Sequence, residues 1–308
     1  MSSAPTATRF FDPQVNGYAG VDFNADDLNV EALAKACQGM RTDGVERFLP
    51  TLITDSMESL VRRIRQLVAI ADEDSLCREM VAGLHIEGPF MQPEQGYIGA
   101  HPVEHAIPPS LDAAKRLIEA GQGRIRIVTL APERDADCIV TRFLSDQGIV
   151  VSAGHTNASR DQLQRSIDAG LKMVTHLGNG CPVNLPRHDN IVQRVLSLAD
   201  SLFISFIADS HHIPLFALKN YLRLVPKQQV VLTTDAIAAA GLGPGTFPLA
   251  GRYVRVAEGD APRFDDSGNL AGSAATMPQM VTHLQSMGIS RSDQAAYCHD
   301  NIVRLLGL

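Results

Sequence analysis

Three residues with metal-binding side chains each follow a short apolar run of the sequence. These residues are Glu87, His155 and His176. A glutamate with two histidines is a ligand set of catalytic zinc sites, which keep one position open for water. One such histidine alone is more often a hydrogen-bonded, half-buried side chain. Three ligands at successive strand ends instead favour a divalent metal site.

Two further residues have types and positions suited to amide hydrolysis. Asp235 follows another apolar run, and His101 lies on a loop shortly after Glu87. A carboxylate beside an activated water can take its proton and return it to a leaving amine, which contributes about 10²–10⁴-fold in rate. His101 is placed to polarise a carbonyl oxygen. The alternatives are a helix cap for Asp235 and a solvated loop side chain for His101.

Arg187 is the candidate for holding an anionic substrate group. It lies in a Pro-rich loop after His176. A guanidinium forms two parallel hydrogen bonds with a phosphate, which makes Arg187 a potential phosphate clamp. An ordinary surface arginine is the commoner explanation of such a residue.

The elements that carry these side chains alternate along the chain. Short β-branched runs, typical of parallel strands buried on both faces, are separated by segments with apolar residues three and four apart. The predicted strands are 9–15, 47–53, 80–86, 125–130, 148–153, 172–176, 202–208 and 229–234. The clearest predicted helices are 30–40, 57–71, 111–120 and 160–169.

This alternation predicts an α/β fold, specifically a (β/α)8 TIM-type barrel. A doubly wound open sheet has the same alternation and is the alternative. Nearly every predicted strand ends in a polar, chemically capable side chain, and in a barrel such ends converge on one mouth. We expect one domain over residues 1–308, with a hairpin excursion at about 241–270 that ends in a turn at 266–269.

Composition excludes several classes of protein. The formal net charge is −7 and there is no Trp, which argues against a nucleic-acid partner. The five cysteines are scattered without metal-clip spacing, as expected for free thiols in the cytoplasm. The first nine residues lack the features of a secretory signal, and no apolar window is long enough to span a membrane.

Eight motifs, in order from about residue 10, closely resemble the N-acetylglucosamine-6-phosphate deacetylase family of the amidohydrolase superfamily. They are Gln14-Val15-Asn16-Gly17 with Gly20-Val21-Asp22-Phe23, Leu49-Pro50-Thr51-Leu52-Ile53-Thr54, His85-Ile86-Glu87-Gly88-Pro89, Thr129-Leu130-Ala131-Pro132-Glu133, Ser152-Ala153-Gly154-His155-Thr156, Thr175-His176-Leu177, Ile207-Ala208-Asp209 and Leu270-Ala271-Gly272-Ser273.

The resemblance implies a role for each matched residue. Glu87, His155 and His176 would bind the metal, Asp235 would be the general base and acid, and His101 would polarise the acetamide carbonyl. The positions that match sugar-phosphate contacts of the family are Ala100, Asn179, Gly180, Arg187, His212 and Leu270. The implied partners are an amino sugar phosphate substrate and a second copy of the chain, in a homodimer.

Two features depart from the usual pattern. Many superfamily members open with His-x-His and bind a second metal, whereas this chain has Gln14-Val15-Asn16. Because amides are poor substitutes for imidazole as ligands, we predict one divalent metal, zinc before iron or manganese, with Gln14 reaching it through water. Segments for the small β-sandwich of the family are not found, so no separate β-sandwich domain is predicted.

Two other functions remain compatible with the sequence. The same metal and carboxylate would serve an amidohydrolase acting on another N-acyl or cyclic amide. A non-catalytic barrel that binds a sugar phosphate is the second alternative, although an intact ligand set with Asp235 would then be surplus. The sequence does not separate gluco from galacto substrates.

Overall fold

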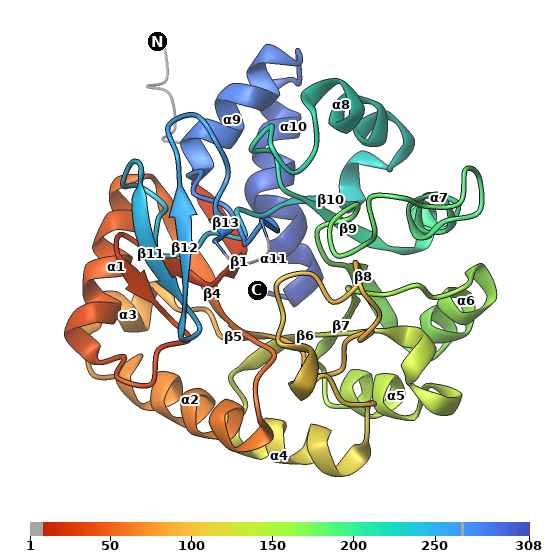
Figure 1. Cartoon of the computed structure of the whole chain (residues 1–308), viewed down its shortest axis with the longest axis horizontal. Helices are drawn as coiled ribbons and strands as arrows, with labels where there is room; N and C mark the ends of the chain where they lie inside the picture. Colours follow the sequence, from red (N-terminus) through yellow and green to blue (C-terminus); the bar gives the residue numbers. More distant parts are fainter. Residues whose placement is uncertain (1–8, 266–267) are drawn as a thin grey trace.

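The computed structural model describes residues 9–265 and 268–308. Eight parallel strands form one sheet that curls into a barrel, and helices surround it (Figure 1). The strands are β1 (Phe10–Val15), β4 (Val45–Ile53), β5 (Leu84–Glu87), β6 (Ile125–Leu130), β7 (Val150–Ala153), β8 (Leu171–Val174), β9 (Phe203–Phe206) and β10 (Val230–Leu232).

The strand order confirms the predicted barrel. Hydrogen-bonded neighbours follow one another in sequence from β1 and β4 through to β10, all in parallel. A doubly wound sheet would reverse this order at a switch point, so that alternative is wrong. Because all eight strands run in one direction, their carboxyl ends open on the same mouth.

Several helices begin at a residue whose side chain caps them. The helices are α1 (Val30–Thr42), α2 (Met57–Ile70), α3 (Ser75–Met80), α4 (Leu111–Gly121), α5 (Ile139–Asp146), α6 (Arg160–Asp168), α7 (Ile191–Leu196), α8 (Leu215–Leu224), α9 (Met277–Ser286), α10 (Arg291–Ala295) and α11 (Asn301–Leu306). Before α6, for example, Ser159 and Gln162 form a reciprocal capping box that satisfies two otherwise unpaired amides.

Several predicted strand boundaries differ by one or two residues, and the largest difference is at the third strand. The third strand was expected over 80–86 but begins at Leu84, because residues up to Met80 belong to α3. The Asp74 side chain accepts hydrogen bonds from two amides at the start of this short helix, which competes with an extended conformation.

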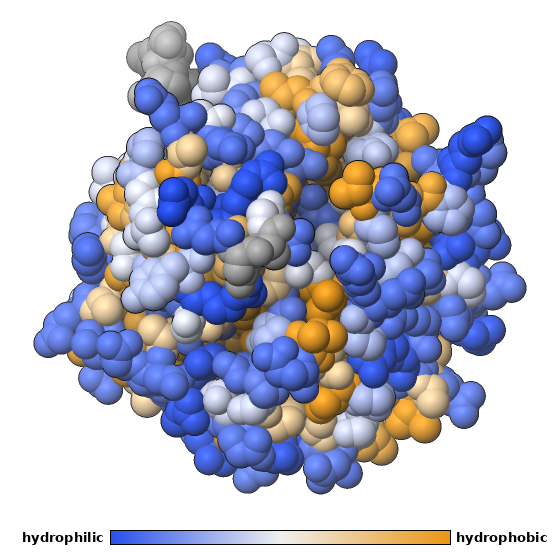
Figure 2. All heavy atoms as spheres, viewed as in Figure 1, coloured by the Kyte–Doolittle hydropathy of each residue, from blue (hydrophilic) through white to orange (hydrophobic). Residues whose placement is uncertain are grey.

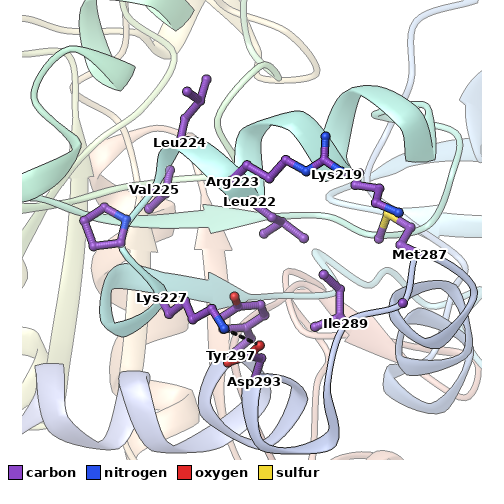
Figure 3. A pocket seen from close by; sticks show the side chains of 12 residues that line it. Lys219, Leu222, Arg223, Leu224, Val225, Lys227, Met287, Ile289, Asp293 and Tyr297 are labelled. Carbon is purple, nitrogen blue, oxygen red and sulfur yellow. Dashed lines mark hydrogen bonds and ion pairs between the residues drawn. The ribbon is translucent and has the colours of Figure 1, made fainter.

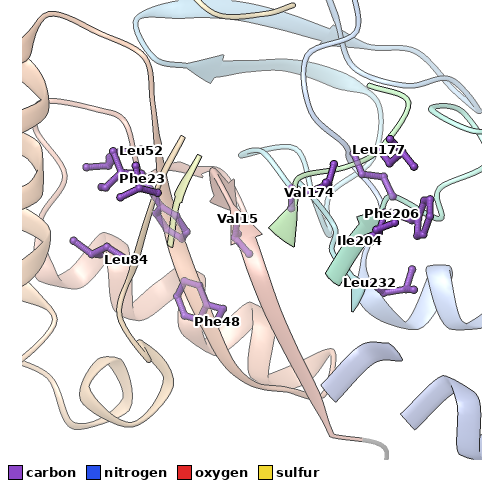
Figure 4. Packing of buried hydrophobic residues seen from close by; sticks show 14 of the residues in the cluster. Val15, Phe23, Phe48, Leu52, Leu84, Val174, Leu177, Ile204, Phe206 and Leu232 are labelled. Atoms are coloured by element: carbon purple, nitrogen blue, oxygen red, sulfur yellow. The ribbon is translucent and has the colours of Figure 1, made fainter. Parts of the chain in front are cut away.

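The core joins the barrel strands to the surrounding helices. Phe23 stacks on Phe48, with ring centroids 5.8 Å apart, and Phe206 stacks on Tyr221 of α8 at 6.1 Å. Figure 4 shows these phenylalanines among aliphatic side chains from strands on both sides of the barrel. Such close packing holds the strand ends, and therefore the residues that follow them, in fixed positions.

The segment after β10 forms a small antiparallel sheet. Its strands are β11 (Gly245–Leu249), β12 (Arg252–Val256) and β13 (Arg263–Phe264), and they lie in front of β1 and β4 in Figure 1. This sheet packs its own apolar cluster against Ile53 and Ile237 of the barrel mouth. Asp266 and Ser267 of the predicted turn lie outside the described residues. The assignment of a single domain stays a prediction.

The surface seen in this view is mainly polar. Figure 2 shows hydrophilic side chains over most of this face, with apolar ones in scattered groups. Among the helices of the described residues, none has both the length and the apolar character needed to cross a bilayer.

Candidate metal centre and active site

Glu87, His155 and His176 come together at the barrel mouth. Glu87 ends β5, whereas the two histidines follow β7 and β8. Their ligand atoms all lie within 4.8 Å of one another. Glu87 Oε1 is 2.8 Å from His176 Nε2 and 3.5 Å from His155 Nε2. All three side chains are buried, so they face one small shared volume.

The backbone turns sharply to aim these side chains. His155 and His176 have φ values of 50° and 30°, and Asp235 has 51°, in the left-handed region that side chains with a Cβ rarely adopt. A neighbouring glycine gives His155 its space. A Cβ on Gly180 would lie 2.6 Å from His155 Nδ1, so this position accepts no larger residue without displacing the ring.

The chemistry of the cluster fits a divalent cation. His155 Nδ1 lies 2.8 Å from the carbonyl oxygen of Tyr97, which only accepts hydrogen bonds, so Nδ1 carries the proton and the Nε2 lone pair faces the cluster. Burial opposes ionisation of Glu87, but the neighbouring imidazoles of His155 and His176 outweigh it and hold the pKa of this carboxyl well below its ordinary value. An ionised carboxylate beside imidazole nitrogens is a suitable ligand set.

His101 lies directly beside the cluster. Its Nε2 is 3.2 Å from His155 Nε2 and 3.8 Å from Glu87 Oε2. The backbone amide of Thr54 donates to His101 Nδ1 at 3.3 Å, so in the neutral ring the proton is on Nε2. Burial, reinforced by His155, lowers the pKa of His101 to about 3, which keeps the ring neutral. His101 thus presents a hydrogen-bond donor to the mouth.

Asp235 follows β10 and is held by two amide side chains from the end of β1. Its Oδ1 accepts hydrogen bonds from Gln14 Nε2 at 2.9 Å and from Asn16 Nδ2 at 2.7 Å. Burial, together with the charge of Glu87, raises the pKa of Asp235 to about 6. A carboxyl with a pKa in this range exchanges a proton readily near neutrality.

Comparison with known proteins identifies the family. No family model matches the chain. N-acetylglucosamine-6-phosphate deacetylase from Homo sapiens is 35% identical over 313 residues, which cover 98% of this chain and 74% of that protein. The enzyme of the same name from Lysinibacillus sphaericus is 32% identical over 278 residues, covering 90% and 70%. The chain belongs to the N-acetylglucosamine-6-phosphate deacetylase family.

A solved structure of the same family has the same fold. It is a variant of N-acetyl-D-glucosamine-6-phosphate deacetylase from Mycobacterium smegmatis in complex with N-acetyl-D-glucosamine-6-phosphate. It superposes with a TM-score of 0.89 at 27% identity, over all of this chain and 82% of that chain. The barrel predicted from the sequence is therefore also the fold of this solved relative.

Several of the residues predicted to bind the sugar phosphate lie beside the cluster. Asn179 donates to the carbonyl oxygen of His176 through its amide group and its backbone, at 3.1 and 3.0 Å. Ala100 precedes His101 and is half-buried. His212, after β9, is held by Asp209 through a 2.7 Å contact between Nδ1 and Oδ2. Arg187 is exposed on the loop between β8 and α7.

The last of these positions, Leu270, precedes a turn that returns the excursion to the barrel. Leu270 pairs with Arg263 through a single bridge, and Ser273 then donates to Asp209 at 3.0 Å. A pocket of about 280 Å³ opens beside Asp209 and Ser273. The excursion and the loop after β9 therefore meet at one side of the mouth.

A larger groove lies away from the mouth. It has a volume of about 770 Å³ and runs between the end of α8 and the α9–α10 connection (Figure 3). Its lining mixes apolar side chains with charged ones, and a 2.7 Å ion pair joins Lys227 to Asp293 within it. None of the residues predicted to form the site lines this groove.

Sequence reasoning gave no role to two residues that organise the site. Asn16 enters the sequence prediction only as part of the Gln14-Val15-Asn16 segment that replaces His-x-His, although it binds Asp235 as closely as Gln14 does. Glu133 accepts hydrogen bonds from the Asn157 amide and the Thr156 hydroxyl, so it fixes the loop that follows His155. The position of both residues after predicted strands was the available signal.

Proposed function

We propose that this chain is an N-acetylglucosamine-6-phosphate deacetylase, which hydrolyses the acetamide to acetate and the amino sugar phosphate. The observation that carries the proposal is the convergence of Glu87, His155 and His176 within 4.8 Å, beside His101, in a chain of this family. Asp235 interacts electrostatically with Glu87 and His176, and it supplies the carboxyl that proton transfer requires.

In the proposed mechanism, Glu87, His155 and His176 hold one divalent cation. When bound, such a cation would act as a Lewis acid and would lower the pKa of water to about 7. Asp235 takes a proton from the attacking water and passes it to the nitrogen of the leaving amine. Its Oδ1 is already engaged by two amides, which leaves Oδ2 to carry the proton.

His101 stabilises the charge that develops on the acetamide oxygen. Its Nε2 proton faces the cluster, because Nδ1 accepts the Thr54 amide. A neutral imidazole that is already oriented in a buried site can donate this hydrogen bond without reorganising during the reaction. The positions of Ala100, Asn179, Gly180, His212 and Leu270 around the mouth support their role in holding the sugar phosphate.

A single metal is proposed because amides replace the usual opening histidines. Gln14 and Asn16 both direct their nitrogen atoms at Asp235. Amide groups are weak ligands for zinc, iron and manganese, and zinc is the first choice for a Glu/His/His set. Contact of Gln14 with the metal through water stays a prediction. We also propose a homodimer, as the family resemblance implies. A cytoplasmic location is proposed as well, which the five free cysteines support.

An acetate-release assay tests the function. The purified protein should release acetate from N-acetylglucosamine 6-phosphate, and the panel should include the galacto epimer and both unphosphorylated sugars. We expect the phosphorylated sugars to have a higher kcat/KM than the unphosphorylated ones, because orientation by a remote phosphate lowers the barrier at the amide. Hydrolysis of other N-acyl amides with no activity on any amino sugar would contradict the proposal.

Replacing Arg187 with alanine tests how the phosphate is held. The kcat/KM for the phosphorylated sugar should fall by about 10–100-fold, since a charge-assisted hydrogen bond contributes about 1.5–3 kcal/mol. The kcat/KM for the unphosphorylated sugar should stay within about twofold of wild type. Arg165→Ala, which removes an exposed arginine of α6, is the matched control. Equal losses on both sugars would exclude a phosphate contact.

A further inference from the structure

A buried carboxylate outside the proposed catalytic set lies at the closing seam of the barrel. Asp12 is in the middle of β1 and is fully shielded from solvent. It accepts hydrogen bonds from the Thr233 hydroxyl at 2.9 Å, the Thr234 amide at 3.1 Å and the Thr234 hydroxyl at 2.5 Å. Its Oδ1 also lies 3.4 Å from the Gln14 amide.

β1 and β10 are the two ends of the strand order, so the barrel closes where the segments of these two strands meet. Between the described parts of these two segments, one parallel bridge is formed, from Val15 to Ala236. Each of the other neighbouring strand pairs forms a parallel ladder of at least two partners, some of them with a register shift. Hydrogen bonds from Thr233 and Thr234 to Asp12 therefore replace part of the ladder where the barrel closes.

The same contacts fix both sides of the proposed general base. Thr233 and Thr234 directly precede Asp235, whose left-handed φ of 51° must be imposed by its surroundings. On the opposite side, Asp12 is two residues from Gln14, which donates to Asp235 Oδ1. One carboxylate thus ties the strand that carries Asp235 to the strand that carries its amide partners.

We propose that Asp12 is a positioning residue for Asp235. By holding Thr233 and Thr234 against β1, it sets the distance between the Asp235 carboxylate and the amide groups of Gln14 and Asn16. This inference rests on the proposed function for its kinetic consequence. Its structural consequence, the orientation of Asp235, is measurable whether or not the proposed substrate is correct.

The chain contains a matched control for a merely stabilising carboxylate. Asp135 is also buried and accepts hydrogen bonds from the amide and hydroxyl of one threonine, Thr141, at 2.7 and 2.8 Å, and from the Val140 amide at 3.0 Å. These contacts begin α5 and do not include the Asp235 segment. Asp12→Asn and Asp135→Asn therefore remove the same charge from similar donor sets.

Kinetics of the two variants separate positioning from stability. For Asp12→Asn we expect kcat on the phosphorylated sugar to fall at least tenfold, with KM within twofold and the metal content unchanged. For Asp135→Asn we expect a comparable loss of resistance to denaturant, with kcat within twofold of wild type. Equal kcat losses in both variants, or a kcat for Asp12→Asn within twofold of wild type, would overturn the inference.

Thr234→Val provides a second route if Asp12→Asn does not fold. The valine removes the hydroxyl that Asp12 binds, and combining both changes should lower kcat no further than the larger single effect. Additive losses in kcat would show that Asp12 and Thr234 act independently, which contradicts the inference.

A crystal structure of either variant supplies a readout independent of activity. We expect Asp235 Oδ1 to lose at least one of its contacts with Gln14 Nε2 and Asn16 Nδ2. An unchanged carboxylate would refute the positioning role. Lack of deacetylase activity in the wild type would refute the proposed function alone.

Discussion

Asp235→Asn should lower kcat for acetate release by about 10²–10⁴-fold while the protein still binds its metal. The asparagine oxygen can accept the same two amide hydrogen bonds that Asp235 Oδ1 accepts from Gln14 and Asn16. The shape of the site is thereby retained, whereas the group that takes and returns the proton is lost. Steady-state kinetics with the phosphorylated sugar, together with metal analysis, measure both properties.

The pattern of loss identifies the role. KM should change little, because Asp235 is proposed to act on the proton and not to bind the sugar. Asp135→Asn serves again as the control for loss of a buried carboxylate that does not contact the Asp235 segment. If Asp235→Asn turned over substrate at the wild-type rate, another group would have to be the general base.

Removing the metal, or a ligand that holds it, is expected to abolish activity. Chelator treatment should stop acetate release, and added divalent zinc should restore it. Glu87→Gln should weaken metal binding by more than about 100-fold, because even groups that only support metal ligands cost about 10–100-fold when they are replaced. The metal content after dialysis and the thermal stability with and without metal measure this effect.

Glu133→Gln is a suitable comparison for Glu87→Gln. Glu133 is also a carboxylate at the mouth, but it is bound to Thr156 and Asn157 and is not part of the 4.8 Å cluster. It should keep one metal per chain. Full activity of the chelated wild-type protein, with no metal detected, would eliminate the proposed metal centre.

The sequence predicted the barrel and the main site for a definite physical reason. Glu87, the two histidines of the cluster and Asp235 each lie at or just after the end of an apolar strand, and the parallel strands of a barrel deliver their carboxyl ends to one place. The positions of Glu87, His155 and His176 are therefore consequences of local pattern and topology together. Most strand boundaries shifted by one or two residues, and the largest shift was at the start of β5, where the capped helix α3 precedes the strand.

The supporting contacts could not be predicted in the same way. Asp12 and Thr234 are 222 positions apart in the sequence, and their hydrogen bond depends on how the first and last strands meet. The local pattern of apolar and polar residues contains no information about this contact between the first and last strands. The role of Asn16 was missed for the same reason, since an amide after a strand is compatible with a turn, a ligand or a partner for Asp235.

The left-handed backbone at His155, His176 and Asp235 has a consequence for engineering this protein. Each such conformation costs about 1–3 kcal/mol, so the folded chain carries a conformational burden where its reactive groups lie. Glycine at these positions would relieve it but would delete the functional side chain. Stabilising substitutions should therefore be sought in the outer helices, because substitutions that relieve strain at the mouth would also remove residues needed for activity.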